Sequence, residues 1–190
     1  LATDLNCWGL NINSGVFNSN DFTLNVGSIT ASTTTTAAVN LGSSTINCAG
    51  FTVYANIALT ASACNIYLSA QNNNLAQLTC QTSQTFKNIY FTGTRGEIRG
   101  PVVADTIRFS GWGNVRGLQT IPHAINCNYL ICDSSSSIST SSSLTSNIGN
   151  GSFAGDCYFS GNSIDFDTLQ LINSGHTILI GGTIKINDTL

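Results

Sequence analysis

The sequence predicts an all-β fold, a right-handed parallel β-helix of about eight or nine coils with roughly 20 residues each. Short segments of alternating apolar and polar residues recur along nearly the whole chain. Charged residues make up only 8% of the chain and Met is absent, so the polar faces of soluble helices are missing. The chain has one Asn-Gly dipeptide, at Asn150, and this scarcity of hairpin turns disfavours an antiparallel meander.

Seven of these segments each contain two apolar residues at alternate positions, and alternate residues of a strand share a face. The steps between successive pairs are 22, 20, 23, 18 and 23 residues, followed by one of 39. The long step indicates two coils, and either Ile148 or Cys157 with Phe159 could supply the unassigned pair. We expect the seven pairs to point inward: Leu24/Val26, Ile46/Cys48, Ile66/Leu68, Ile89/Phe91, Ile107/Phe109, Leu130/Cys132 and Leu169/Leu171.

A second apolar column supports the first. An apolar residue follows the first member of each pair after 5 positions in two coils and after 8 or 9 in the other five. This cadence of strand, turn and strand is what a triangular coil requires. The column consists of Ile29, Phe51, Leu75, Ile98, Val115, Ile138 and Ile178.

We expect residues 1–190 to form a single solenoid domain about 40 Å long, at roughly 4.8 Å per coil. The chain starts at Leu1 without a signal sequence, which is typical of a processed product or a fragment of a longer chain. Residues 134–146 are almost entirely Ser and Thr and form either a coil or a flexible loop. Ile138 and Leu144 lie in phase with the other coils and favour a coil.

Composition excludes several function classes. A net charge of −3 and a pI near 4.9 argue against nucleic-acid binding, which needs a basic face. The apolar runs are too short for membrane insertion. Seven Cys without a Cys-x-x-Cys pair predict no zinc site, and no cofactor is indicated. We expect Cys48 and Cys132, which occupy inward positions, to be buried as small apolar residues, which suits assembly in a reducing compartment.

One charged patch stands out between residues 95 and 123. In the repeat alignment, Arg99 and Arg116 occupy nearly equivalent positions, so they could be neighbours about 5 Å apart on adjacent coils. Such a pair needs an anion between its charges. Glu97 could supply it in a surface ion-pair ladder, or the patch could bind an acidic sugar or a partner's carboxylates. The candidate binding residues are Arg95, Glu97, Arg99, Arg108, Trp112, Arg116 and His123.

Acidic residues offer another chemistry, because glycoside hydrolysis needs two carboxyl groups roughly 5 to 10 Å apart. Asp165 and Asp167 alternate with Phe166 and would share an outer strand face. If both carboxylates converge in a groove, an enzyme is favoured, whereas carboxylates in open solvent exclude it. Neither His123 nor His176 has a partner at ligand or triad spacing, so we assign no catalytic or metal-binding residue.

The segments Phe22–Thr30 and Ser44–Val53 alternate in a way that resembles the degenerate Asn/Gly/Ser/Thr repeats of phage tail fibres and tailspikes, and of bacterial surface β-helix adhesins. The resemblance covers most of the chain and contains no diagnostic motif. It implies a parallel β-helix on a virion or cell surface. It also implies that the chain associates with itself or with neighbouring structural subunits and binds host glycans, as members of such families do.

We therefore expect a non-enzymatic structural or adhesive module of a virion fibre or other surface appendage. It would bind partner subunits and, through its side faces, a cell-surface glycan. A polysaccharide-degrading β-helix enzyme is the first alternative. A bacterial extracellular adhesin or filament subunit is the second.

Overall fold

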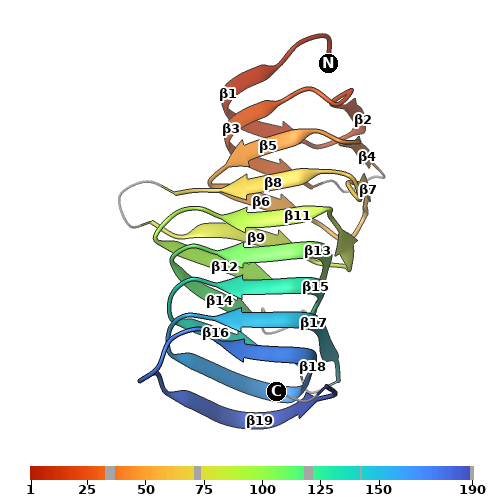
Figure 1. Ribbon diagram of the computed structural model, residues 1–190. Helices are drawn as coiled ribbons and strands as arrows, with labels where there is room; N and C mark the ends of the chain where they lie inside the picture. The colour runs from red at the N-terminus through yellow and green to blue at the C-terminus, as the bar shows by residue number, and fades with distance from the viewer. Residues whose placement is uncertain (33–36, 71–73, 118–121, 142, 189–190) are drawn as a thin grey trace.

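The computed structural model describes residues 1–32, 37–70, 74–117, 122–141 and 143–188. Every strand pairing is parallel, and no helix occurs among these residues, which confirms the predicted parallel β-solenoid (Figure 1). It has about eight turns of roughly 21 residues. The strands are β1 (Leu5–Ile12), β2 (Gly15–Asn18), β3 (Leu24–Ala31), β4 (Ala37–Asn40), β5 (Thr45–Cys48), β6 (Gly50–Val53), β7 (Ile57–Thr60), β8 (Asn65–Leu68), β9 (Ala76–Cys80), β10 (Gln84–Thr85), β11 (Asn88–Phe91), β12 (Arg95–Arg99), β13 (Val102–Phe109), β14 (Trp112–Arg116), β15 (Ile125–Cys132), β16 (Ser136–Ser139), β17 (Thr145–Phe153), β18 (Cys157–Leu171) and β19 (Ile178–Ile186).

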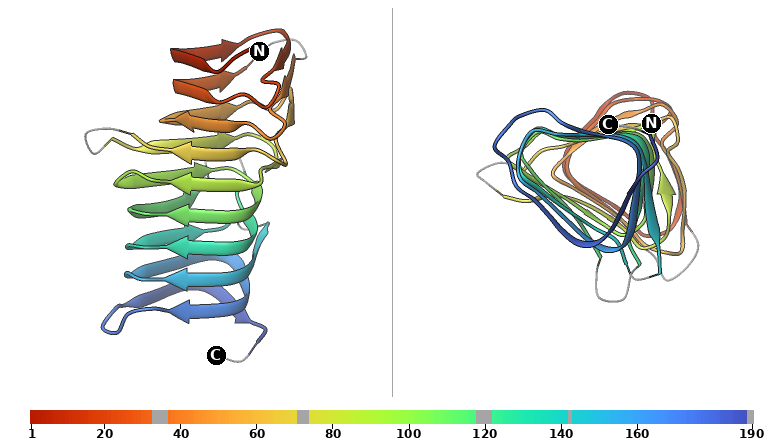
Figure 2. Two further views of the ribbon diagram at one scale, coloured as in Figure 1. Left: turned by 45° about the horizontal axis from the view of Figure 1, so that its top comes forward. Right: turned by 60° about the horizontal axis from the view of Figure 1, so that its bottom comes forward.

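Each turn of the solenoid has three faces, and the view along the axis is triangular (Figure 2). Face A holds β5, β8, β11 and the second halves of β13, β15 and β17. Face B holds β6, β9, β12, β14, β16 and the first part of β18. Face C holds β2, β4 and β7, then the first halves of β13, β15 and β17. Corner 1 joins face A to face B, corner 2 joins B to C, and corner 3 joins C to the next face A.

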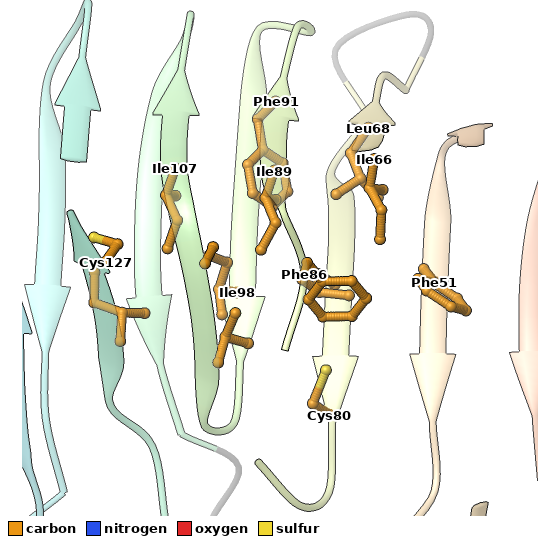
Figure 3. Packing of buried hydrophobic residues seen from close by; sticks show 14 of the residues in the cluster. Phe51, Ile66, Leu68, Cys80, Phe86, Ile89, Phe91, Ile98, Ile107 and Cys127 are labelled. Carbon is orange, nitrogen blue, oxygen red and sulfur yellow. The ribbon is translucent and has the colours of Figure 1, made fainter. Parts of the chain in front are cut away.

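The seven predicted inward pairs stack in register on face A. All their members are buried except Leu171, which lies on the last coil and is 47% exposed. Figure 3 shows Ile66, Leu68, Ile89 and Phe91 among the buried side chains of this core. Alternation along the strand therefore identified this core face correctly.

The coil that the repeat alignment left unassigned uses Gly151 and Phe153, and not Ile148 or Cys157 with Phe159. Gly151 pairs with Leu130 and Leu169 on the adjacent coils, whereas Ile148 lies on face C and Phe159 on face B. A Cβ at residue 151 would lie 2.5 Å from Cε1 of Phe166. The Phe166 ring thus takes the space that an inward side chain fills in other coils.

The second predicted column lies on face B and is correct for five of its seven members, Ile29, Phe51, Ile98, Val115 and Ile138. The other two, Leu75 and Ile178, are wrong, because Leu78 and Ile180 occupy the column in their coils. Leu78, and not Leu75, pairs with Phe51 and Ile98 in the fourth coil. Farther along, Phe159 follows Ile138 and is followed by Ile180. The sequence spacing predicted Leu75 in place of Leu78, because corner 1 contains more residues in that coil than in the neighbouring coils.

The Ser/Thr-rich segment 134–146 contains β16 and the start of β17, so a coil runs through its described part. Ile138 is fully buried there and Leu144 is partly exposed. Residue 142 lies outside the described residues. Small hydroxyl side chains allow this coil to keep the solenoid's dimensions, since they satisfy turns without adding bulk.

All seven Cys are free thiols, and only Cys7 is exposed. Burial raises the pKa of Cys48, Cys64, Cys80 and Cys127 to about 12, and it also raises the pKa of Cys132 and Cys157. Thiol reagents attack the thiolate, so both burial and protonation protect these six groups.

We expect a thiol reagent such as DTNB at pH 8 to label one Cys per native chain rapidly. All seven should react in denaturant. Cys7→Ser should remove the rapid reaction and serve as the control. Rapid labelling of three or more thiols in the native protein would contradict the buried positions.

Candidate functional site

Glu97 is the centre of the predicted charged patch. Its side chain points outward from β12 on face B, yet only 1% of it is exposed. Four side chains donate to the carboxylate: Arg99 Nε at 2.6 Å, Gln77 Nε2 at 2.8 Å, Asn114 Nδ2 at 3.0 Å, and Arg116 Nε. A buried carboxylate with this many donors is held in a fixed position.

Arg99 and Arg116 are direct neighbours on β12 and β14, as the repeat spacing predicted. Glu97 supplies the anion between them. The expectation of an exposed surface ladder was wrong in one respect, because the carboxylate lies beneath the two Arg side chains and is shielded from water. Both guanidinium groups are therefore already engaged by the protein itself.

Arg95 and Trp112 form a second pair on the same two strands, closer to corner 1. They are in register, and Arg95 Cζ lies 5.5 Å from the centre of the Trp112 ring. A cation over an indole face at an exposed site contributes about 0.5 to 1 kcal/mol. The pair presents a positive charge and an aromatic surface side by side.

The remaining two candidates lie elsewhere. Arg108 is on face A, where its Nε donates to Asp133 Oδ2 at 2.8 Å. His123 is at corner 2, with Nε2 3.1 Å from Ser139 Oγ and a buried Nδ1 that has no hydrogen-bond partner among the described residues. Burial lowers the pKa of His123, so the imidazole is neutral at neutral pH and adds no positive charge to the patch.

Corner 1 is hollowed along the solenoid axis, and we call this hollow the corner groove. Its N-terminal part has a volume of about 750 Å³. Trp8 and Tyr67 contribute aromatic surface to it, and Asn25 and Asn47 contribute amides. Trp8 is 93% exposed, the highest exposure among the large apolar side chains of the described residues.

The corner groove continues toward the C-terminus in a second hollow of about 610 Å³. The two hollows meet at Thr92, which lines both. The second one contains Trp112 and also borders Ser134 on the next coil. Small residues on successive coils lie between the two tryptophans: Ala49, Ser69, Ala70, Gly93, Ser110 and Gly111. A Cβ at Gly111 would lie 2.3 Å from the carbonyl oxygen of Thr94, so this part of the wall requires glycine.

Face A forms one wall of the corner groove with a column of outward side chains. Asn47 Nδ2 donates to Asn25 Oδ1 at 2.7 Å, and Asn25 Nδ2 donates to Asn6 Oδ1 at 2.9 Å. The column continues with Tyr67 and Tyr90, whose stacked rings have centres 5.0 Å apart. These mutual contacts hold amides and phenol rings in fixed positions on successive coils.

A third hollow, of about 420 Å³, lies at corner 3 toward the C-terminus, and both Asp165 and Asp167 line it. Asp165 Oδ2 is 3.6 Å from Lys185 Nζ and Asp165 Oδ1 accepts a hydrogen bond from Ser163 Oγ, while Asp167 Oδ1 is 3.4 Å from Asn187 Nδ2. The two carboxylates therefore line the same groove, which is the arrangement that favours an enzyme. One of them is engaged by a cation.

Within the described ranges, no group of three or more His, Cys, Asp and Glu side chains is arranged to hold a metal ion. The same part of the chain contains no helix with the length and hydropathy needed to cross a membrane.

The protein is thus a parallel β-solenoid with a polar and aromatic groove along one corner. Comparison with protein-family models, curated proteins and solved structures found no match.

Sequence reasoning found one end of the corner groove, at Arg95 and Trp112, and missed the other. Trp8, Tyr67 and the Asn column lie earlier in the chain than Trp112, and Trp8 precedes it by 104 residues. The Asn column and Tyr67 could have been found from one position of the repeat. This position lies between the two inward residues of each pair, and its side chain points outward. Read down the coils, that position is Asn25, Asn47, Tyr67, Tyr90 and Arg108.

Proposed function

We propose that this chain is a non-enzymatic structural and adhesive rod of a virion fibre or other surface appendage, and that it binds a glycan in the corner groove. The observation that carries the proposal is the groove itself, which runs from Trp8 to Trp112 along one corner. Exposed aromatic rings and amides are the groups that pack on sugar rings and hydrogen-bond to their hydroxyls.

The rigidity of the scaffold supports an adhesive role. Successive coils are joined by parallel ladders on all three faces, so the groove walls keep their positions without a ligand. Tyr67 and Tyr90 stack on each other and the Asn side chains are bonded in a column, so little side-chain entropy is lost on binding. A preformed surface of this kind favours recognition of an extended molecule.

Association with structural partners is the second part of the proposal, and the last coil supports it. The inward positions of β19 hold apolar residues. The residues at the same positions of the preceding coil are buried. Ile180 is 59% exposed and Ile186 is 39% exposed. Such a surface is normally covered by a further coil, a cap or another chain. A virion fibre and a bacterial surface adhesin both provide this environment, so either setting fits.

A polysaccharide-degrading enzyme is the second candidate, and the hollow at corner 3 is the observation that favours it. Asp165 and Asp167 are two residues apart on one strand face, which separates them by roughly 7 Å. That spacing suits two carboxyl groups acting on a glycosidic bond. However, Lys185 Nζ lies 3.6 Å from Asp165 Oδ2, so one of the two carboxylates is already engaged by another side chain of the protein.

The proposal is tested by measuring binding of the purified chain to an array of bacterial and host-cell polysaccharides. We expect binding to at least one polysaccharide, weakened about tenfold or more in a variant with both Trp8→Ala and Trp112→Ala, because each change removes an aromatic contact. Tyr54→Ala is the matched control, since Tyr54 is an exposed aromatic residue outside the groove, 39% accessible.

The same incubations distinguish the two candidates when assayed for new reducing ends. A stable polysaccharide chain supports the adhesive rod. Cleavage that disappears in Asp165→Asn or Asp167→Asn would instead establish the enzyme. Binding that is unchanged in the double Trp variant would remove the corner groove from the proposal.

A further inference from the structure

The charges around the corner groove are unevenly neutralised. Arg99 and Arg116 are bound to Glu97, and Arg108 is bound to Asp133. Among the four Arg side chains, all of them described, Arg95 is the one without a carboxylate partner. It is exposed and lies over Trp112, which lines the groove. The groove therefore has a net positive charge at this end, in a protein whose overall charge is negative.

The groove's length sets the size of its ligand. The chain passes corner 1 once per coil, at Trp8, Gly27, Ala49, Ser69, Thr92 and Ser110 in turn. Five coil spacings of about 4.8 Å give roughly 24 Å from Trp8 to the coil of Trp112. One coil spacing is comparable to the length of one sugar ring in an extended chain. A ligand that fills the groove is thus a linear oligomer of about six units.

The main chain at corner 1 excludes an extended peptide added as a β-strand. That mode of binding needs a row of unpaired N–H and C=O groups. Here the backbone joins successive coils: Ala49 N donates to Gly27 O at 3.0 Å, and Ser69, Thr92 and Ser110 each donate to the preceding coil at 2.9 Å. Recognition in this groove must use side chains, namely aromatic rings, amides, hydroxyls and one guanidinium group.

We propose that the corner groove binds an extended anionic polysaccharide whose chain runs parallel to the solenoid axis. An acidic group of one sugar pairs with Arg95 while that sugar packs against Trp112, and the sugars farther along the chain contact Tyr67, Asn47 and Trp8. This inference rests on the proposed glycan binding and adds the charge, length and orientation of the ligand. Arg95 is well suited to the task, because its guanidinium can donate two hydrogen bonds to one carboxylate.

The test uses a panel of linear polysaccharides bearing carboxylates, consisting of polygalacturonate, alginate, hyaluronan and polysialic acid, each with its carboxyl-reduced counterpart. Binding is measured by isothermal titration calorimetry or biolayer interferometry. We expect at least one polyanion to bind at least about tenfold more tightly than its reduced form. Raising the salt concentration from about 0.15 M to about 1 M should weaken that binding, because it shortens the screening length from about 8 Å to about 3 Å.

Two variants test whether Arg95 is the residue that pairs with the acidic groups of the polysaccharide. Arg95→Gln should reduce polyanion affinity about tenfold, to nearly that of the reduced polymer, and should leave the affinity for the reduced polymer unchanged. Lys87→Gln removes the same charge from corner 3 and is the matched control. Circular dichroism should be unchanged in both variants, since neither residue is buried. Arg95→Gln should lower the temperature of thermal unfolding only slightly, because it removes the contact with Trp112.

Length and orientation are tested with oligomers of the polymer that binds best. Affinity should rise with each added sugar and level off at about six units. Trp8→Ala should weaken the binding of hexamers but not of dimers, because Trp8 lies at the far end from Arg95. Equal binding of a polymer and its reduced form would overturn the inference and leave the proposed glycan binding intact, whereas no binding to any polymer would contradict both.

Discussion

Replacing both Arg99 and Arg116 by Met is expected to lower the free energy of unfolding by about 3 to 5 kcal/mol. The double change leaves the carboxylate of Glu97 buried without a cation, while the hydrogen bonds from Gln77 and Asn114 remain. A buried charge without a cation is far more costly than the loss of two partly exposed side chains, because it cannot recover its hydration. Urea unfolding followed by circular dichroism measures the effect.

The source of this loss can be separated from lost packing. Adding Glu97→Gln to the double variant removes the buried charge and should recover most of the stability. Arg108→Met is the control, since its ion pair with Asp133 is partly exposed, with side-chain exposures of 49% and 31%, and should contribute at most about 1 kcal/mol. A triple variant no more stable than the double one would show that burial of the charge is not the dominant effect.

Phe166→Ala is expected to destabilise the protein by about 3 to 5 kcal/mol, because it empties a large part of the core near the C-terminal end. The ring is fully buried and meets Phe159 and Phe153 edge to face, with ring centres 5.8 and 6.1 Å apart. It also fills the space beside Gly151. Thermal and urea unfolding of the single variant measure the loss.

A double-mutant cycle tests whether Phe166 explains the glycine at position 151. Gly151→Ala alone should destabilise by about 1 to 3 kcal/mol, since its Cβ would lie 2.5 Å from the Phe166 ring. In the Phe166→Ala background that clash is absent and only the contact with Phe153 Cε2, at 3.0 Å, remains, so the same substitution should cost much less. Additive effects of the two changes would contradict a shared space, because independent sites add.

The core of face A could be predicted from sequence because its signal is local. Each inward pair is two residues apart in one short strand, and alternation of the side chains follows from strand geometry alone. The neighbouring positions of Arg99 and Arg116 were predictable for the same reason, since a regular repeat converts a sequence interval into a position on a coil.

Where a coil departs from the apolar pattern, sequence reasoning failed. Gly151 has no side chain to mark it as an inward residue, and the ring that replaces it comes from Phe166 on another face. Leu75 was chosen over Leu78 because the number of residues in a corner is free to vary, while the register of the strands is fixed by hydrogen bonding. Face C was not predicted as a column, although it also carries buried apolar pairs, among them Ala37/Val39, Ile125/Cys127 and Ile164/Phe166.

The sequence by itself determined the architecture, its period and the identity of most core residues. The reason is that each coil must bury alternating apolar side chains, so the apolar residues recur in the sequence with the period of the coils. Only the tertiary structure decided what the outward side chains do. It buried Glu97 under two Arg side chains, left Arg95 unpaired, and aligned Trp8 with Trp112 along one corner. Those relations join residues on different coils, and outward positions carry no apolar periodicity from which to infer them.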